Sequence, residues 1–241
     1  MSKGVQCFQI EIRVNDLTRA MGFYKESFGW GVYQASPQYA LVDAGQMPVI
    51  GIMSDPRLRN GVSPLYLVGD CVAAADHAKE LGGRVMFTKT EVPGAGWFTA
   101  ALDPWGNEIY FWQQAVHGEP KLKQTPPAPF AFVEIATPNL EKTVEYYNKL
   151  MAWSFWNVAF AENYAIAEGY GLKRGIGIYG NASTPGVLSY IQVTNLEETR
   201  LKILANGGEI VVAPEPFLNE GRYLIFADPF GNRLGALEVT S

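Results

Sequence analysis

Hydrophobic and polar residues follow two periods along this chain, and the two periods succeed one another in a regular order. Residues 8–14 alternate apolar with polar side chains, as a half-buried strand does. Asp16 can then cap a helix, which the apolar spacing predicts over residues 17–28 and which Gly29 ends. Short strands bounded by proline and glycine are predicted next, at residues 39–42 and 49–53.

The same order restarts three times along the chain. Asp70 precedes a predicted helix over residues 72–81, and Asn139 and Asn195 are the matching caps in the second half. The segment Asn195-Leu-Glu-Glu198 also resembles a capping box. Further strands are predicted at 65–68, 84–87, 96–102, 108–112, 132–136, 176–179 and 188–193, near Tyr164, and in a last segment that ends at Ala236. Four βαβββ modules of about 60 residues therefore account for nearly the whole chain, which predicts an α+β fold.

A five-residue motif closes each half of the chain and indicates a duplication. Asp103-Pro-Trp-Gly-Asn107 and Asp228-Pro-Phe-Gly-Asn232 lie 125 positions apart, and Gly82-Gly83 matches Gly207-Gly208 at the same offset. Self-similarity at a fixed offset is typical of repeated units, so the two halves are read as copies of each other. Asp-Pro-x-Gly is typical of a tight turn, so we assign the motif to turn structure and not to catalysis.

The strand pattern stops between the copies, where proline and charged residues replace it. Residues 117–128 are therefore predicted to be a linker. The predicted domains are residues 1–116 and 129–241. Each would hold two modules, at about 5–60 and 62–115 in the first copy and about 129–184 and 186–241 in the second.

Composition removes several classes of function. The chain of 241 residues has a formal net charge of -5 and no cluster of Lys and Arg, so nucleic acid is not expected as a partner. No apolar run is long enough to span a membrane, and the N-terminal residues lack the apolar stretch of a signal peptide. We therefore expect a cytoplasmic protein with no membrane partner. Cys7 and Cys71 are too few for a disulfide framework and are expected to be reduced, buried thiols.

Four short motifs follow one another in a fixed order. They are a strand ending in Asn-Asp-Leu at 15–17, a helix with Phe23-Tyr24 that closes on Phe-Gly-Trp at 28–30, the pair Gly82-Gly83 and the Asp-Pro-x-Gly-Asn hairpin. In this order they resemble the vicinal-oxygen-chelate superfamily, whose members include glyoxalase I, extradiol dioxygenases, fosfomycin-resistance enzymes and bleomycin-resistance proteins. The resemblance covers both copies from end to end. It implies that paired modules curl mixed sheets into open cups, with the helices outside and a ligand inside.

The resemblance also implies where a metal would bind, and this chain departs from it there. Metal-using members carry a histidine on the first strand of a module, seven residues before the residue that opens the helix. That position is Gln9 in the first module and Phe132 in the third. In the second and fourth modules it falls at Ser63 or Pro64 and at Leu188 or Ser189, and the last-strand glutamate of the family becomes Tyr110 and Gly235. Divalent metals prefer imidazole nitrogen and carboxylate oxygen, so neither a metal nor another cofactor is expected.

The two histidines of the chain offer no other catalytic site. His77 lies in the predicted helix over residues 72–81 and His117 opens the linker, so both are expected to be solvated. A Ser–His or Cys–His nucleophilic pair needs an imidazole within hydrogen-bond reach of the nucleophile, and neither histidine is placed for it.

Strand alternation assigns residues to the inner face of each cup. If Gln9 faces inward, then Glu11 and Arg13 face inward with it, and the first cup has a polar floor. The aromatic wall of this cup is expected to contain Trp97, Tyr110 and Trp112.

The second cup is expected to be more apolar. Its inward residues are predicted to be Phe132, Glu134, Tyr190, Gln192 and Leu237. Gly235 would leave extra room for a ligand. Arg222 occupies the position that matches Trp97, which indicates that the two cups prefer different ligands.

Glu11 and Glu134 are equivalent across the duplication, and each lies between apolar neighbours. A carboxylate in a partly desolvated cup has a raised pKa and can act as a general base. Alternatively, it hydrogen-bonds to a neighbouring strand or to water, or Gln9, Glu11 and Arg13 form an internal ion pair that satisfies the floor.

Three functions remain open, and whether the chain is an enzyme is one of the open points. The favoured function is that of a metal-independent relative of the glyoxalase and bleomycin-resistance proteins, which binds a small, hydrophobic or partly aromatic organic ligand in a cup. The second is a cofactor-free lyase or isomerase acting on a small carbonyl or aromatic metabolite, with Glu11 or Tyr110 as the catalytic proton-transfer group. The third is a structural or protein-binding module, which has no specific support. Four modules already contain the interfaces that two-module relatives obtain by dimerising, so a monomer or a loose homodimer is expected.

Overall fold

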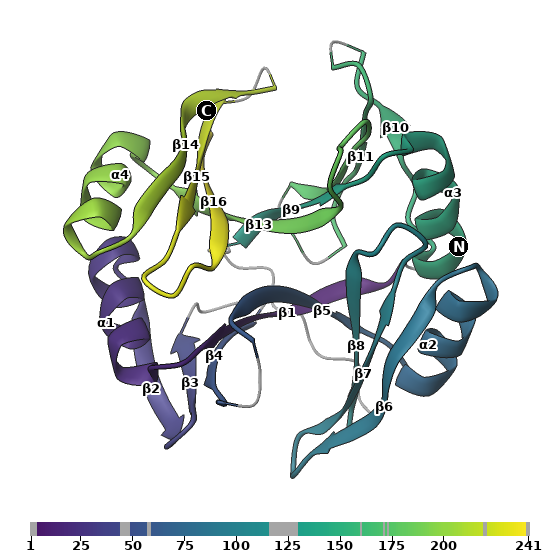
Figure 1. The fold of residues 1–241 in the computed structure, drawn as a ribbon, viewed down its shortest axis with the longest axis horizontal. Coiled ribbons are helices and arrows are strands. Elements are labelled where there is room, and N and C mark those ends of the chain that lie inside the picture. The colour runs from purple at the N-terminus through teal and green to yellow at the C-terminus, as the bar shows by residue number, and fades with distance from the viewer. Residues whose placement is uncertain are drawn as a thin grey trace. The chain divides into compact units, whose positions relative to one another are not determined.

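The computed structural model describes residues 4–43, 49–56, 59–115, 130–159, 161–170, 172, 174–218 and 221–239. In these residues a strand, a helix and three further strands follow one another four times (Figure 1). The first module comprises β1 (Gln6–Val14), α1 (Leu17–Phe28), β2 (Gly31–Ser36), β3 (Tyr39–Asp43) and β4 (Val49–Ser54). The second comprises β5 (Gly61–Leu67), α2 (Cys71–Glu80), β6 (Arg84–Val92), β7 (Gly96–Leu102) and β8 (Glu108–Gln114).

The second copy repeats this order. Its first module comprises β9 (Phe130–Ala136), α3 (Leu140–Met151), β10 (Trp156–Asn157), β11 (Tyr164–Ala167) and β12 (Gly175–Tyr179). Its second comprises β13 (Gly186–Val193), α4 (Leu196–Ala205), β14 (Glu209–Phe217), β15 (Gly221–Ala227) and β16 (Arg233–Val239). The predicted α+β fold of four βαβββ modules is confirmed. The predicted linker, residues 117–128, lies outside the described residues.

Each helix begins at the cap residue that the sequence predicts. The side chains of Asp16, Asp70, Asn139 and Asn195 each accept a hydrogen bond from a backbone N–H of the first turn. The capping box predicted at Asn195 forms only in part. Asn195 Oδ1 accepts from the Glu198 N–H at 2.9 Å, but the Glu198 carboxylate pairs with Lys202 Nζ at 2.7 Å, one turn further along α4.

Each copy contributes one eight-stranded mixed sheet. The strand orders are β2-β3-β4-β1-β5-β8-β7-β6 and β10-β11-β12-β9-β13-β16-β15-β14. β1 runs parallel to β4, β5 to β8 and β13 to β16, while the neighbours within each group of outer strands are antiparallel. The sequence did not reveal β2, because its residues are mostly exposed and carry no alternation of apolar and polar positions.

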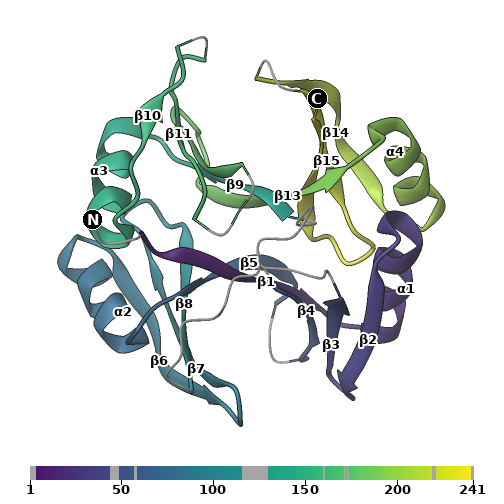
Figure 2. The same ribbon diagram turned by 180° about the vertical axis from the view of Figure 1, so that it is seen from behind.

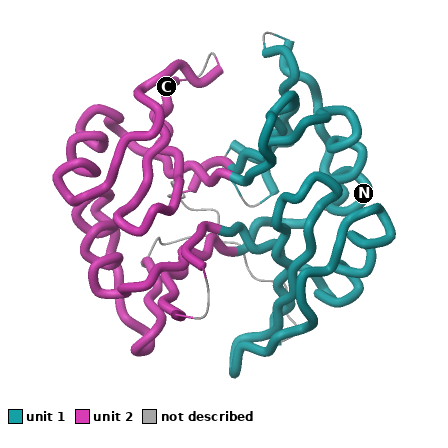
Figure 3. The backbone as a smooth tube through the Cα atoms, in the orientation of Figure 1, with its two compact units in different colours: residues 1–8, 63–122, 133–187 teal, residues 9–62, 123–132, 188–241 magenta. Residues whose placement is uncertain are grey.

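The chain divides into two compact units, and each unit combines modules from both copies (Figure 3). Unit 1 comprises residues 1–8, 63–122 and 133–187, and therefore holds the second and third modules. Unit 2 comprises residues 9–62, 123–132 and 188–241, and holds the first and fourth modules. In unit 2, α1 contacts α4, and in unit 1, α2 contacts α3, as Figure 2 also shows.

In unit 2, the Asp-Pro-Phe-Gly-Asn motif of the second copy binds the first helix and first strand of the first copy. Asp228 Oδ2 accepts a hydrogen bond from the Tyr24 hydroxyl at 2.9 Å, and Asn232 Nδ2 donates to the Arg13 carbonyl at 3.0 Å. The Asp228 carboxylate also closes its own turn by accepting from the N–H groups of Phe230 and Asn232. The motif is therefore more than the turn that the sequence predicts.

Unit 1 repeats these contacts with the roles of the copies exchanged. Asp103 Oδ2 accepts from the Tyr147 hydroxyl of α3 at 3.1 Å, and Asn107 Nδ2 donates to the Ala136 carbonyl of β9 at 3.2 Å. Asp103 and Asp228 are only 3% and 4% exposed, so these bonds lie in the interior of their units. Removing a donor from a buried carboxylate is costly, because water cannot replace it.

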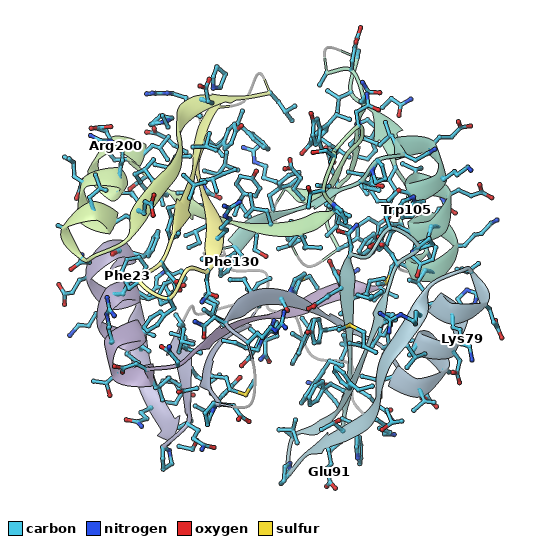
Figure 4. All side chains as sticks on the ribbon, viewed as in Figure 1. Phe23, Lys79, Glu91, Trp105, Phe130 and Arg200 are labelled. Atoms are coloured by element: carbon cyan, nitrogen blue, oxygen red, sulfur yellow. The ribbon has the colours of Figure 1, made fainter. Side chains whose placement is uncertain are left out.

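Aromatic side chains surround each of these tyrosines. The Trp30 ring stacks on Tyr24 with centroids 5.2 Å apart, and the Trp153 ring stacks on Tyr147 with centroids 5.6 Å apart. Phe23 and Phe130 lie in the interior of unit 2, while Lys79 on α2 and Arg200 on α4 point away from the sheets (Figure 4).

No helix in the described part of the chain is long and apolar enough to cross a membrane.

We predict that Tyr24→Phe and Tyr147→Phe each lower the free energy of unfolding by about 1–3 kcal/mol, because each leaves a buried carboxylate with one donor fewer. Urea unfolding followed by tryptophan fluorescence measures the change. Tyr33→Phe is the control, since Tyr33 is 53% exposed. Equal stability of all three variants would show that the two buried hydrogen bonds do not stabilise the packing of the two modules within each unit.

Candidate functional site

The inner strand of the first module carries the predicted polar residues on one face. Ile10, Ile12 and Val14 on β1 are at most 2% exposed, and the residues between them, Glu11 and Arg13, point to the opposite side of the strand. Glu11 is itself only 6% exposed. The sequence therefore placed a carboxyl group correctly, in a more buried environment than an open cup implies.

The two carboxyl oxygens of Glu11 have different surroundings. Oε2 accepts hydrogen bonds from Gln9 Nε2 and from the Tyr39 hydroxyl, the latter at 3.2 Å, and Gln9 Nε2 also lies 3.0 Å from the Tyr39 oxygen. Oε1 is buried and has no hydrogen-bond partner among the described residues. A buried polar atom without a partner is uncommon in folded proteins and is a candidate contact for a ligand or a water molecule.

Gly51 on β4 makes room for this arrangement. It lies directly opposite Glu11 in the parallel pairing of β1 and β4. A Cβ atom at residue 51 would overlap both Glu11 Oε2 and the Tyr39 hydroxyl. The glycine is thus needed for the close approach of the carboxyl and phenol groups.

Burial dominates the electrostatics of the site. It raises the pKa of Glu11 from 4.5 to about 7, against the lowering effects of the hydrogen bonds from Gln9 and Tyr39 and of the Arg13 charge. Burial and the neighbouring Glu11 carboxyl also raise the pKa of Tyr39, which stays a neutral hydroxyl. The Arg13 guanidinium donates from Nε to the Arg59 carbonyl at 3.2 Å. Glu11 is therefore the group of this cluster that changes protonation near neutral pH.

Tyr39 is not among the site residues that the sequence predicts, although the duplication contains a signal for it. Tyr39 and Tyr164 are 125 positions apart, the offset of the Asp-Pro-x-Gly-Asn motifs. In unit 1 the Tyr164 hydroxyl donates to Glu134 Oε2 at 2.6 Å, as Tyr39 does to Glu11 in unit 2. The glutamate–tyrosine pair is thus a repeated feature of the two copies.

The second copy differs at the position of Gln9. Its equivalent, Phe132, is 1% exposed and packs in unit 2 against Phe217 and Tyr190, with ring centroids 5.4 and 5.8 Å away. Tyr223 contacts both of these rings at 6.2 and 6.0 Å. This cluster of four aromatic side chains agrees with the predicted apolar character of the second copy.

The prediction that Gly235 leaves room for a ligand is wrong. The Tyr190 ring lies directly against the Gly235 backbone, and a Cβ atom at residue 235 would overlap three of its ring carbons. The space that the missing side chain opens is therefore filled from the neighbouring strand. Tyr190 pairs with Gly235 in the parallel register of β13 and β16, which brings the ring to this position.

The prediction that Trp97 shares a wall with Tyr110 and Trp112 is also wrong. In the register of β7 and β8, Phe98 faces Trp112 and Trp97 faces Gln113, so Trp97 lies on the opposite side of the sheet from Trp112. Gln113 Oε1 accepts from the Cys71 N–H at the start of α2, which identifies that side as the helix side. A shift of one residue reverses every side chain of a strand, and the sequence did not define this register.

Arg222 also lies on the side of its sheet opposite to the predicted one, because of the strand register. It pairs with Glu238 in the register of β15 and β16, and Glu238 Oε2 accepts from the Leu196 N–H at the start of α4. Trp97 and Arg222 therefore lie on the helix sides of their sheets, where Lys89 Nζ sits 4.6 Å from the Trp97 ring. The prediction that these two residues give the cups different ligand preferences is therefore wrong.

The remaining aromatic candidates of the first copy lie in unit 1. Trp112 is 7% exposed, its ring is parallel to that of Phe8 at 6.2 Å, and its Nε1 is buried without a partner among the described residues. The Tyr110 hydroxyl donates to Glu108 Oε2 at 2.8 Å, in an exposed position. In unit 2, Gln192 Oε1 is a further buried acceptor without a described partner.

The histidines and cysteines take no part in these clusters. His77 is exposed, and its Nδ1 lies 3.4 Å from Glu80 on the same helix. His117 lies outside the described residues. Cys7 and Cys71 are buried and form no disulfide bond with each other.

Comparisons with known proteins identify the family. The sequence pattern of the Glyoxalase/Bleomycin resistance protein/Dioxygenase superfamily matches residues 6–111 and again residues 130–235. The chain belongs to this superfamily. Curated proteins of Mycobacterium bovis and Mycobacterium tuberculosis, both named "Putative glyoxylase CFP32", are 25% identical to it over 238 residues, which cover 92% of this chain and 90% of theirs.

Solved structures of the superfamily share the fold. The Mn(II)-bound glyoxalase from Novosphingobium aromaticivorans has a TM-score of 0.70 at 14% identity and covers 99% of this chain and 83% of its own. A variant of homoprotocatechuate 2,3-dioxygenase from B. fuscum has a TM-score of 0.68 at 16% identity and covers 99% and 72%. At these identities the likeness shows the fold alone.

The side chains at the metal positions of the family do not fit a divalent cation. The register pairs Leu65 with Tyr110 and Tyr190 with Gly235, so the inward positions two residues before Leu65 and Tyr190 are Ser63 and Leu188. The six positions are thus Gln9, Ser63 and Tyr110 in the first copy and Phe132, Leu188 and Gly235 in the second. They contain neither an imidazole nor a carboxylate. Among the described residues, no three His, Cys, Asp or Glu side chains gather into another metal site.

We predict that Glu11 makes the folded protein less stable as pH rises. Its pKa is about 7 in the folded state, above the ordinary value of 4.5, so its favourable contribution is complete below pH 4.5 and is lost as pH rises through about 7. Relative to wild type, Glu11→Gln should therefore gain about 2–3 kcal/mol in the free energy of unfolding between pH 5 and pH 8.5.

Urea unfolding at the two pH values measures this difference. Glu26→Gln on the exposed side of α1 is the matched control, and its difference from wild type should stay constant. A constant difference for Glu11→Gln as well would mean that the Glu11 carboxyl is ionised throughout.

Proposed function

We propose that this protein binds a small organic molecule at the face of β1 that carries Gln9, Glu11 and Arg13, and that it does so without a metal ion. The observation that carries the proposal is the buried Glu11 Oε1, which has no described hydrogen-bond partner although its twin Oε2 has two. A ligand atom that bonds to Oε1 would remove the cost of leaving it unsatisfied.

A comparison with a structural carboxylate supports this interpretation. Asp228 is as buried as Glu11, but both of its oxygens accept hydrogen bonds, Oδ1 from two backbone N–H groups and Oδ2 from Asn232 Nδ2 and Tyr24. The fold itself thus supplies hydrogen-bond donors to both oxygens of this structural carboxylate. Glu11 is satisfied on one side only, which favours a role in binding.

The proposed ligand is hydrophobic or partly aromatic, in keeping with the other candidate residues of the sheets. Trp112 in unit 1 has a buried indole N–H without a described partner, and Gln192 in unit 2 has a buried amide oxygen without one, so each is a candidate contact within its own unit. Gln9, Arg13, Phe132, Glu134 and Tyr190 remain candidate ligand contacts, whereas Trp97 and Arg222 do not, because they lie on the helix sides.

Metal independence rests on the side chains that replace the family's ligands, above all Phe132 inside its aromatic cluster. We predict that purified, dialysed protein retains well below one equivalent of manganese, iron, nickel or zinc by inductively coupled plasma mass spectrometry. One equivalent of any of them surviving dialysis would contradict the proposal. Native mass spectrometry of the same sample would show a small organic molecule that copurifies.

A second candidate function is a cofactor-free lyase or isomerase that uses Glu11 to move a proton. The observation that favours it is the pKa of Glu11, which at about 7 is well matched to acid–base chemistry at neutral pH. Tyr110 is a weaker candidate, since its hydroxyl is bonded to Glu108 in an exposed position. Under this function, Glu11→Gln abolishes turnover and leaves binding intact.

Proton exchange separates the two functions without a known substrate. In D2O, a general base at Glu11 would accelerate exchange of the α-protons of a bound ketone such as acetophenone. We expect wild type and Glu11→Gln to give the same exchange rate as Glu26→Gln, because the favoured function involves no proton transfer. Faster exchange with wild type and Glu26→Gln than with Glu11→Gln, measured by proton NMR, would establish the enzymatic function instead.

A further inference from the structure

We propose that the Glu11 site recognises an acceptor oxygen on an uncharged or anionic ligand, such as a carbonyl, phenolate or enolate oxygen, to which Glu11 donates from Oε1 as a carboxylic acid. This inference rests on the proposed function and names the chemical class of the ligand. It follows from how the donors are distributed around the two carboxyl oxygens.

The position of the acid proton is determined by the neighbours of Oε2. Gln9 Nε2 and the Tyr39 hydroxyl both point hydrogen atoms at Oε2, so a proton there would face two donors. Oε1 has no such neighbour among the described residues. The protonated form therefore carries its hydrogen on Oε1, and an acceptor is what that hydrogen lacks.

Gly51 allows Oε2 to lie close to its donors. Oε2 and the Tyr39 hydroxyl pack so closely on Gly51 that even a Cβ atom at this residue would overlap both. The pairing of Glu11 with Gly51 in the strand register places the glycine there. The oxygen without a described partner, Oε1, is therefore the one that a ligand would meet.

The surrounding charge selects against a cation. Arg13 follows Glu11 on the same face of β1, and its positive charge acts on the Glu11 carboxyl. From β3 the group facing Glu11 is Tyr39, which stays protonated, and from β4 it is Gly51. Tyr33 on β2 acts on Tyr39 and not on Glu11. An acceptor oxygen on a neutral or anionic molecule suits this environment, and an ammonium or amidinium group does not.

Protonation supports the same conclusion. Burial keeps a large fraction of Glu11 in the acid form at neutral pH, because its pKa is about 7. Binding of an acceptor should therefore weaken as pH rises, since only the acid form donates. Binding of a cation should strengthen instead.

Three probes of similar size test the inference on the full chain: acetophenone, with an acceptor oxygen; benzamidine, with a cationic donor; and toluene, with no polar atom. Backbone amide NMR titrations at about pH 6 and pH 8.5 measure the affinity of each. We expect acetophenone to bind more tightly than the other two at pH 6 and about 30-fold more weakly at pH 8.5, following the acid fraction of Glu11.

Substitutions locate the effect. Glu11→Gln should bind acetophenone at both pH values with the pH 6 affinity of wild type, because the side-chain amide places an uncharged N–H donor where Oε1 lies. Glu11→Ala should lose at least about tenfold in affinity at pH 6, and Glu26→Gln should follow wild type. The amide spectra also show whether each variant is folded.

The outcomes separate the inference from the proposed function. Tighter binding of benzamidine, or acetophenone affinity that rises with pH, would overturn the inference and leave small-molecule binding in place. Binding of acetophenone and toluene with equal affinity, insensitive to pH and to Glu11→Ala, would have the same consequence. Failure of all three probes to bind at either pH would count against both.

Discussion

The fold depends on one hydrogen-bonded contact that occurs twice, between the buried aspartate of a closing hairpin and a tyrosine on the first helix of the other copy. Asp228 accepts from Tyr24 in unit 2, and Asp103 accepts from Tyr147 in unit 1. In each aspartate the Oδ1 atom accepts hydrogen bonds only from its own turn, whereas Oδ2 accepts one from the turn and one from the tyrosine of the other copy. Neither copy can complete this interior alone, because a buried carboxylate without its donors is strongly destabilising. This reciprocity explains why both halves of the chain contain the same motif.

Two buried carboxyl groups of the chain differ in how many of their oxygens the fold supplies with hydrogen-bond donors. Asp228 has donors on both oxygens, whereas Glu11 has donors on Oε2 only. Both groups are almost fully buried, so burial alone does not tell them apart. The two groups differ in the number of carboxyl oxygens that accept hydrogen bonds. Glu11 Oε1 accepts none from the described residues, and Gly51 makes room for Oε2 and the Tyr39 hydroxyl.

The two copies have diverged at the positions where relatives hold a metal. In the first copy Gln9 supports Glu11 as a hydrogen-bond donor. In the second copy Phe132 enters an aromatic cluster with Tyr190 and Phe217, and Tyr190 covers Gly235. One replacement keeps a polar site and the other fills the space with packed rings. Equivalent positions of the two copies thus lie in two different physical environments within one chain.

The sequence by itself determined what depends on neighbours along the chain. It revealed the duplication, the four helices with their caps, the family and the inward direction of Glu11, because capping and strand alternation act over a few residues. The sequence did not predict the exposed edge strand β2, since a strand that buries no face carries no apolar pattern. Only the tertiary structure decided strand register, which moved Trp97 and Arg222 to the helix sides, and only it brought Tyr39 to Glu11, Tyr190 to Gly235 and each hairpin to the other copy. These contacts join residues far apart in the chain, and their free energy is set by packing and pairing that no local pattern encodes.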